Sequence, residues 1–119
     1  MILEIAGKDV EITTGVRFIR ELDKRFKLDV ENGLMKLGFG LNQVAMDIDM
    51  ENPTILVDLI ECGVAGNKGF KPNTAQIEAF VDKQEDYAEL FELFDKEMAE
   101  SNATKKKWLK TRKSNENQT

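Results

Sequence analysis

Apolar residues recur at spacings of three and four along most of the chain, and this periodicity predicts amphipathic helices. The first helix begins at Val16 and includes the stretch FIRELDKRF, in which charged residues fill the positions between the apolar ones. We expect it to end near Leu28 and to be capped by the hydroxyl of Thr13 or Thr14. Four further helices are predicted over residues 41–50, 53–65, 73–82 and 87–98.

Two of these helices begin with a recognisable local signal. Asn52 and Pro53 combine a capping side chain with a residue that suits the first helical turn. Asn73 is followed three residues later by Gln76, which predicts a capping box.

The first twelve residues follow a different pattern. Apolar and β-branched side chains at Ile2–Ile5 and Val10–Ile12 flank the turn formers Gly7 and Asp9, which predicts a short hairpin. Two strands alone are marginally stable in water, so the hairpin has to pack on the helices. We therefore expect a mainly α fold: a single domain over residues 1–103, built from about five helices with an N-terminal β-hairpin.

The charge of the chain divides at its C-terminal end. Residues 1–103 carry 11 Lys and Arg against 21 Asp and Glu, a net charge of −10, although the net charge of the whole chain is only −5. Residues 104–119 carry six basic residues against one acidic residue. Low hydrophobicity with dense like charge predicts a flexible, disordered basic tail, or a helix formed only on contact with a partner.

The segment NGLMKLGFGLN, residues 32–42, interrupts the helical pattern with three glycines. It lacks the Gly-Lys-Ser/Thr ending of a phosphate-binding loop. Two interpretations remain: a loop whose apolar residues fill the core, or a mobile apolar segment that docks on a partner. The second interpretation makes five residues candidates for partner binding: Leu34, Met35, Leu37, Phe39 and Leu41.

The inventory of reactive side chains argues against catalysis and metal binding. The chain has no histidine and a single cysteine, Cys62, so the commonest general base and the usual zinc ligands are missing. Asp47 and Asp49 lie two residues apart on a predicted helix and point about 200° apart, so they cannot close on one metal ion. We expect no enzyme activity, metal or cofactor. No signal peptide or membrane-spanning run is apparent.

The order of the parts resembles a known family. A hairpin is followed by FIRELDKRF, GLMKLGFGLN, NPTILVDLIECGV, KPNTAQIEAFVD, YAELFELFDKEM and a lysine-rich end. Over about residues 1–110 this order is similar to that of the tail assembly chaperones of long-tailed phages (siphoviruses) and prophages of Gram-positive hosts. No single motif is specific, and the order and spacing carry the resemblance.

The resemblance implies a small, helical, non-catalytic protein of the host cytoplasm that is absent from the mature virion. It implies binding to the phage tape-measure protein, which is kept soluble during tail assembly. It also implies a longer product, made by a programmed ribosomal frameshift, that recruits the tail-tube protein. The run Lys105–Lys107 is a candidate for the slippery stretch where that product diverges.

An alternative function rests on the tail sequence KKKWLKTRK. A nucleic-acid-binding or regulatory protein could use Trp108 to stack on a base and the basic residues to bind phosphates. The acidic body opposes this interpretation, because it repels nucleic acid. A helical protein with some other partner, including a second copy of itself, is also left open.

Overall fold

The computed structural model describes residues 1–26 and 39–117; for Phe39 and residues 114–117 it describes the backbone alone. The described elements are β1 (Ile2–Ile5), β2 (Lys8–Glu11), α1 (Val16–Arg25), α2 (Phe39–Asp49), α3 (Thr54–Val64), α4 (Thr74–Asp82), α5 (Tyr87–Glu100) and α6 (Lys105–Asn117). The mainly α fold with an N-terminal hairpin is thereby confirmed, with six helices in the described residues rather than about five.

The hairpin is closed by a two-residue turn. The strands pair antiparallel with Ile5 opposite Lys8, which leaves Ala6 and Gly7 as the turn. Both turn residues have positive φ, 55° at Ala6 and 76° at Gly7. These angles are typical of the type I′ turn, whose twist matches that of the strands. Leu3, Ile5 and Val10 consequently turn one face of the hairpin into the core.

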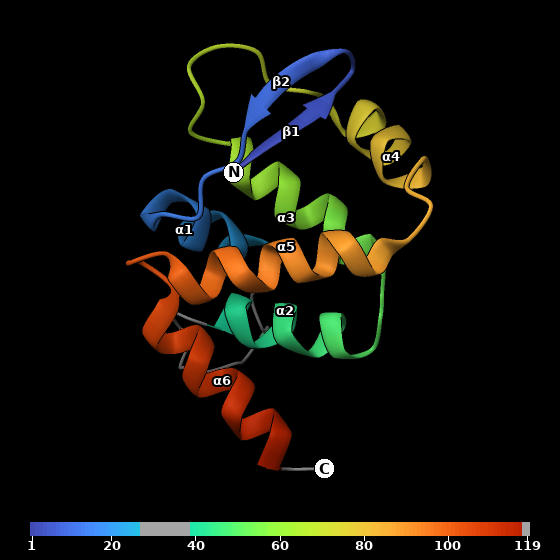
Figure 1. Ribbon diagram of the computed structural model, residues 1–119. Coiled ribbons are helices and arrows are strands. Elements are labelled where there is room, and N and C mark those ends of the chain that lie inside the picture. The colour runs from blue at the N-terminus through green and yellow to red at the C-terminus, as the bar shows by residue number, and fades with distance from the viewer. Residues whose placement is uncertain (27–38, 118–119) are drawn as a thin grey trace.

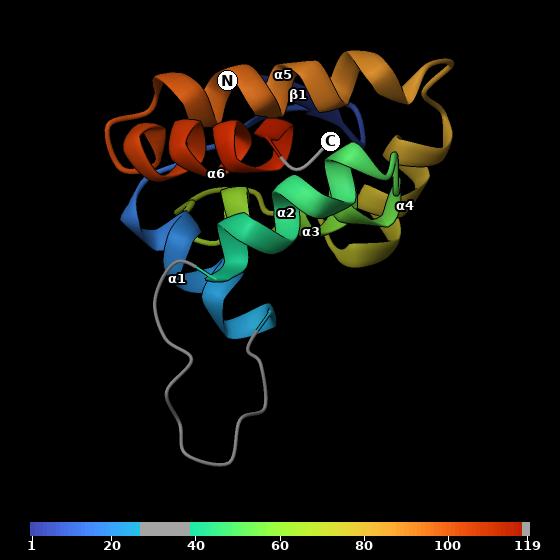
Figure 2. The same ribbon diagram turned by 90° about the horizontal axis from the view of Figure 1, so that it is seen from below.

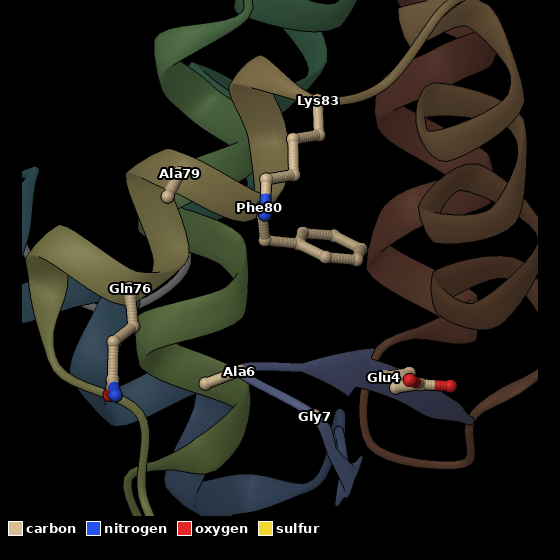
Figure 3. A pocket seen from close by; sticks show the side chains of 7 residues that line it. All are labelled: Glu4, Ala6, Gly7, Gln76, Ala79, Phe80 and Lys83. Atoms are coloured by element: carbon tan, nitrogen blue, oxygen red, sulfur yellow. The ribbon is translucent and has the colours of Figure 1, made fainter.

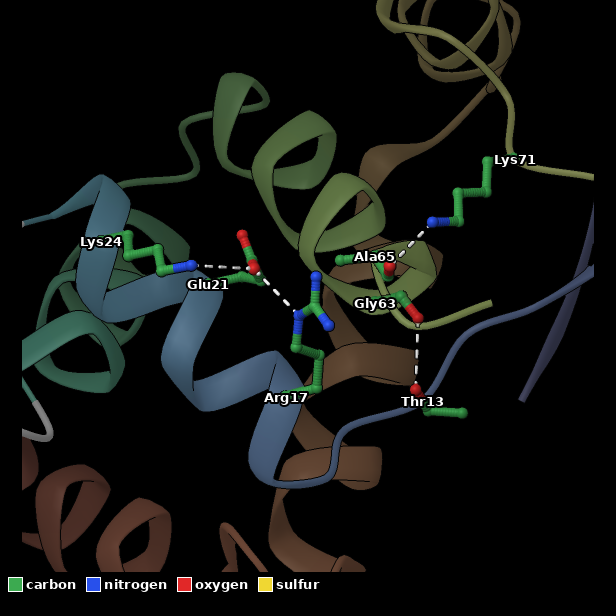
Figure 4. Close-up of polar contacts among 7 residues, drawn as sticks. All are labelled: Thr13, Arg17, Glu21, Lys24, Gly63, Ala65 and Lys71. Atoms are coloured by element: carbon green, nitrogen blue, oxygen red, sulfur yellow. Dashed lines mark hydrogen bonds and ion pairs between the residues drawn. The ribbon is translucent and has the colours of Figure 1, made fainter. Parts of the chain in front are cut away.

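A glycine lets the hairpin approach the central helix α3. A Cβ atom on Gly63 would lie 2.4 Å from Cγ2 of Ile12, so no side chain fits there. The carbonyl of Gly63 accepts hydrogen bonds from the backbone N–H of Thr13 at 3.0 Å and from its hydroxyl at 3.3 Å (Figure 4). The hydroxyl of Thr13 is therefore used against α3, which contradicts its predicted role as a cap of α1; Gly15 takes that position without a side-chain cap.

The apolar faces of the helices meet in one core. In Figure 1, α5 crosses in front of α3. Helix α2 contacts α3 and lies on the side of α5 that faces away from the hairpin. The helix predicted over residues 87–98 is confirmed as α5, in which Leu90, Phe91, Phe94 and Met98 are all buried. Leu93, on another face of the helix, stays 44% exposed. The largest fully buried side chains are Trp108, Phe18 and Phe94.

The ends of two helices carry well-defined caps. At α4 the side chain of Asn73 accepts from the backbone N–H of Gln76, and the side chain of Gln76 accepts from the backbone N–H of Asn73. This reciprocal pair is the predicted capping box. After α2 the backbone N–H groups of Glu51 and Asn52 return to the carbonyls of Ile48 and Asp47. Glu51 has φ 55° there, the left-handed conformation of a Schellman cap.

The basic tail is helical over the described residues, which is the second of the two forms that its composition predicted. Residues 105–117 form helix α6, which packs against α2 and α5 (Figure 2). The hydroxyl of Thr104 donates to the carbonyl of Met98 at 2.7 Å and ties the start of α6 to the end of α5. Trp108 is fully buried. A single large aromatic side chain thus orders a segment whose average composition favours disorder.

Candidate functional site

The structure reaches only part of the apolar segment predicted to bind a partner. Leu34, Met35 and Leu37 lie outside the described residues, and Phe39 begins α2 without a described side chain. Leu41 is 2% exposed and belongs to the core. The described part of this segment is therefore the anchor of α2 on the rest of the molecule.

A hydrogen bond holds the start of α2 against α1. The backbone N–H of Gly40 donates to the Asp23 carboxylate at 3.0 Å, which joins the start of α2 to the end of α1. A Cβ atom on Gly40 would lie 2.8 Å from Cβ of Leu22, so glycine is needed for this approach. The positive end of the α2 dipole also favours the negative charge of Asp23.

Helix α6 packs against both α2 and α5 and is anchored there by one aromatic side chain. Trp108 extends from α6 into the core, and its indole Nε1 donates to Oδ1 of Asp95 on α5 at 2.6 Å. This short bond to a carboxylate satisfies the polar atom of the buried ring. The predicted stacking of Trp108 on a base is therefore not possible while α6 stays in place.

Arg112, one helical turn after Trp108, completes the attachment of α6. Its Nη1 donates to Oδ1 of Asp49 on α2 at 2.7 Å and to the Ala45 carbonyl at 3.4 Å. Its Nη2 lies 3.8 Å from Oδ2 of Asp95, and its guanidinium lies 5.5 Å from the centre of the Trp108 ring. Asp95 thus receives both the indole and the guanidinium, so the two anchors support each other.

Sequence reasoning missed this attachment, although its signal is present. Trp108 and Arg112 lie four residues apart, so they share one face of a helix. Thr111, the neighbour of Arg112, donates from its hydroxyl to Oδ1 of Asn42 on α2 at 3.0 Å. The remaining lysines of the tail, Lys105, Lys106, Lys107, Lys110 and Lys113, are exposed. A search for one anchored face, rather than for average hydropathy, would have found the helix.

Comparison with known proteins identifies the family. The sequence model of the family described as "Phage tail assembly chaperone protein, TAC" matches residues 2–112. The chain belongs to the phage tail assembly chaperone family. The suspected resemblance is thereby confirmed at the level of the family. Comparisons with curated proteins and with solved structures found no significant match.

The match covers every described element of this chaperone except the end of α6, so the family region includes Trp108 and Arg112. The family description directs attention to phage tail proteins as partners and to surfaces that bind a polypeptide. None of the helices in residues 1–26 and 39–117 is both long and apolar enough to cross a bilayer.

A groove of the chaperone lies between the hairpin and α4. It has a volume of about 280 Å³ and is lined by Glu4, Ala6, Gly7, Gln76, Ala79, Phe80 and Lys83 (Figure 3). Its charged side chains, Glu4 and Lys83, come from opposite walls. Among the described residues no three His, Cys, Asp or Glu side chains are grouped to hold a metal ion. We assign no ligand to this groove.

Cys62 is buried in α3, as its sequence context predicted. Burial raises the pKa of the Cys62 thiol to about 12. A thiol with this pKa carries almost no thiolate at neutral pH, so it is a poor nucleophile and a poor metal ligand. Cys62 therefore acts as a small core residue.

A partly exposed ion cluster joins α1 to α3. Nη1 of Arg25 lies 2.9 Å from Asp58 and 3.1 Å from Glu61. Burial raises the pKa of Asp58, and the hydrogen bond from Arg25 only partly offsets this. The pKa of Arg25 is also raised: burial lowers it, but the bonds to Glu61 and Asp58 outweigh that effect. The two shifts have different causes: burial outweighs the ion pair at Asp58, whereas the hydrogen bonds outweigh burial at Arg25. We interpret this cluster as a tie between helices.

Proposed function

We propose that this protein is a non-catalytic tail assembly chaperone that binds the phage tape-measure protein and keeps it soluble while the tail is built. The single observation that supports the proposal most strongly is the family match over residues 2–112. The proposal extends the family description to one client, because a tape-measure protein is long and helical and needs its apolar stripe covered before assembly.

The surface of the chain suits such a role. Several large apolar side chains are exposed among the described residues: Ile2, Val16, Met46, Met50, Phe70, Leu93 and Leu109. The flexible side chains of Met46 and Met50 lie one turn apart and adapt to different partners. Burying about 400 Å² of apolar surface contributes on the order of 10 kcal/mol, most of which the cost of association consumes. Binding would therefore be reversible, as assembly requires.

We further propose that the client contacts the apolar segment that contains Leu34, Met35, Leu37 and Phe39. Leu41 has a different role in this proposal, because its burial makes it an anchor rather than a contact. The bond between Gly40 and Asp23 supports the proposal, since it fixes the residue that follows Phe39 on the folded body.

Co-expression with the tape-measure protein tests the client and the segment together. The wild-type chain should move the tape-measure protein from the pellet to the soluble fraction, and the two should co-purify. The double variant Leu34→Ser/Met35→Ser should reduce the soluble client at least severalfold while its circular dichroism stays unchanged. Glu92→Ser is the matched control, because it changes an exposed side chain of α5 outside the apolar segment and should change the yield little.

The results separate two parts of the proposal. A tape-measure protein that stays insoluble with every variant would contradict the proposed client. Equal rescue by the wild type and by the double variant would keep the client and remove the segment from the proposal.

The remaining features are proposed on the basis of the family. We infer that the protein acts in the host cytoplasm, that the mature virion lacks it, and that a longer frameshifted product recruits the tail-tube protein. Mass spectrometry of infected cells and of purified virions tests all three: both products should occur in cells and neither in virions. A gene without a slippery heptamer at Lys105–Lys107, or without an overlapping downstream frame, would contradict the frameshift.

A further inference from the structure

The surface of α2 and α5 against which α6 packs has the chemistry of a helix-binding site. We name it the α6 seat and define it by Asn42, Ala45 and Asp49 on α2 and Asp95 on α5. It offers a buried position for an indole ring and two carboxylates, at Asp49 and Asp95, for a guanidinium. Deep aromatic positions next to a paired arginine are the usual centres of binding energy at protein interfaces.

The helix that fills the seat is attached at few points. Of residues 105–113, only Trp108 is buried. Lys106, Lys110 and Lys113 follow one another at helical spacings of four and three, and like charges at these spacings destabilise a helix. The attachment of α6 therefore depends on Trp108, Arg112 and Thr111, so loss of these contacts releases the whole helix.

The connection between α5 and α6 permits such a release. It consists of Ser101–Thr104 and contains neither proline nor glycine. The Ser101 hydroxyl donates to the Thr14 carbonyl at 2.8 Å, and Thr104 donates to the Met98 carbonyl at 2.7 Å. Backbone hydrogen bonds from Thr104 and Lys105 to the Ser101 carbonyl hold the turn itself, so the two side-chain bonds are the ones that tie it to the rest of the molecule. A net contribution of about 1 kcal/mol is typical of one such bond, and more where the group is buried, as Thr104 is.

We propose that the α6 seat is a docking site for a helix of the client protein, and that α6 fills it when no client is bound. The occupant is a helix with an aromatic residue followed four positions later by arginine, because α6 itself shows that this pair fits the seat. A basic helix is favoured, since residues 1–103 carry a net charge of −10. This inference rests on the proposed function for the identity of the client, but not for the properties of the seat.

Helix α6 is covalently linked to the domain, and this link determines how strongly it competes with a client helix for the α6 seat. A helix linked through four residues competes at an effective concentration in the millimolar range. A client helix must therefore bind the α6 seat more tightly than α6 does, or it must belong to a long chain that carries several helices of this kind. In return, α6 fills the position of the indole ring whenever the client is absent, so Trp108 itself stays out of water.

A peptide of α6 itself tests the seat without any client. A fluorescein-labelled peptide of residues 101–117 is titrated into the full chain carrying Trp108→Ala, in which the seat lacks its own anchor, and into the wild type. We expect the peptide to bind the variant at least tenfold more tightly than the wild type in fluorescence polarisation. The same peptide with alanine in place of its tryptophan should bind about 30-fold more weakly, the factor that corresponds to about 2 kcal/mol at a central aromatic residue.

The alanine peptide also controls for charge, because it keeps every lysine and arginine. Equal binding of both peptides would show unspecific attraction to the acidic body and would overturn the proposal. If the chain with Trp108→Ala loses its circular dichroism signal, Arg112→Ala replaces it, since this change weakens the attachment and keeps the buried ring. No difference in peptide affinity between Arg112→Ala and the wild type would likewise overturn the proposal.

A disulfide that locks α6 tests the client. Asn42 and Thr111 touch across α2 and α6, so Asn42→Cys/Thr111→Cys provides a cross-link that glutathione disulfide closes and dithiothreitol opens. Cys62 is buried and stays out of this exchange. Capture of the tape-measure protein should be at least tenfold weaker for the locked chain than for the same chain after reduction, a comparison in which both states carry the substitutions at Asn42 and Thr111. Asn42→Cys alone is the matched control and should not respond to oxidation.

The peptide titration and the disulfide cross-link together separate the failure of this inference from the failure of the proposed function. Equal capture by the locked and the reduced chain would overturn the inference and leave the proposed function intact. Capture by neither chain, with the peptide still bound to the Trp108→Ala variant, would contradict the tape-measure client and keep the seat. Concentration-dependent dimers that exclude the peptide would assign the seat to the α6 helix of a second copy and overturn the proposal.

Discussion

At the scale of single residues, two glycines fix how closely the elements of this fold approach each other. Gly40 brings α2 onto α1, and Gly63 brings α3 onto the end of the hairpin. Neither position has a positive φ, so the requirement is one of space rather than of backbone conformation. The two glycines therefore act as contact points between elements.

Substitution of Gly63 measures that contact. Gly63→Ala places a methyl group 2.4 Å from Cγ2 of Ile12, so we expect the free energy of unfolding to fall by about 1–3 kcal/mol. Urea denaturation followed by circular dichroism provides the measurement. Gly69→Ala is the control, because nothing lies within 4 Å of its Cβ, and its midpoint should change little. An unchanged midpoint for Gly63→Ala would contradict the close packing.

Glu51 offers a change in the opposite direction. It has φ 55° after α2, a conformation that glycine adopts without cost. Glu51→Gly should raise the free energy of unfolding by about 0.5–1 kcal/mol. The same replacement inside a helix, Glu92→Gly in α5, should instead lower it by about 1 kcal/mol. If chemical denaturation showed that both substitutions lower the free energy of unfolding, Glu51 would not terminate α2 as described.

At the scale of elements, the charged face of α1 is organised by ion pairs. Glu21 receives Arg17 at 3.0 Å and Lys24 at 3.5 Å on the surface of the helix (Figure 4). The hydrogen bond from Arg17 is the main cause that lowers the pKa of Glu21 below its ordinary value of 4.5. These ion pairs lie within α1 and stabilise the helix itself.

This pKa shift predicts a weak pH dependence. A carboxylate whose pKa is lowered by folding adds stability above its ordinary pKa and loses it as the pH falls through the folded value. Glu21→Gln should therefore cost no more than about 0.5 kcal/mol at pH 7, because the pairs are exposed. The difference from the wild type should shrink below pH 4.5 and vanish at lower pH in thermal unfolding. A constant difference across pH would contradict the ion-pair origin.

The contrast between α5 and α6 explains how far the sequence predicts the elements. Apolar residues repeat along α5, so its buried face follows from periodicity alone. In α6 a single indole provides the anchor, and its partner Asp95 lies 13 residues away in sequence. Periodicity counts apolar residues within one element, whereas the burial of Trp108 depends on the surface that two other helices build. The candidate segment with Leu34 and Met35 remains a prediction.

At the scale of the whole molecule, α6 should be the part that opens most easily. It depends on few buried contacts, whereas most of the side chains of α3 are buried. Amide protons of α6 should exchange with deuterium at least tenfold faster than those of α3 under native conditions. Trp108→Ala should accelerate exchange in α6 further and leave α3 unchanged.

Amide exchange of α6 and α3 at one common rate would contradict the prediction that α6 opens most easily. It would mean that α6 opens only when the entire molecule unfolds. In that case α6 would be a fixed part of the domain and not an exchangeable occupant of its seat.

The exposed lysines of α6 also have an electrical consequence. Basic side chains gather on one outer helix, while the body beneath it carries the negative charge. Such a separation gives the molecule a dipole moment that rotates it during diffusion, so a highly charged polypeptide meets it in a preferred orientation. The bias weakens as added salt shortens the Debye length, and the encounter rate reports it directly.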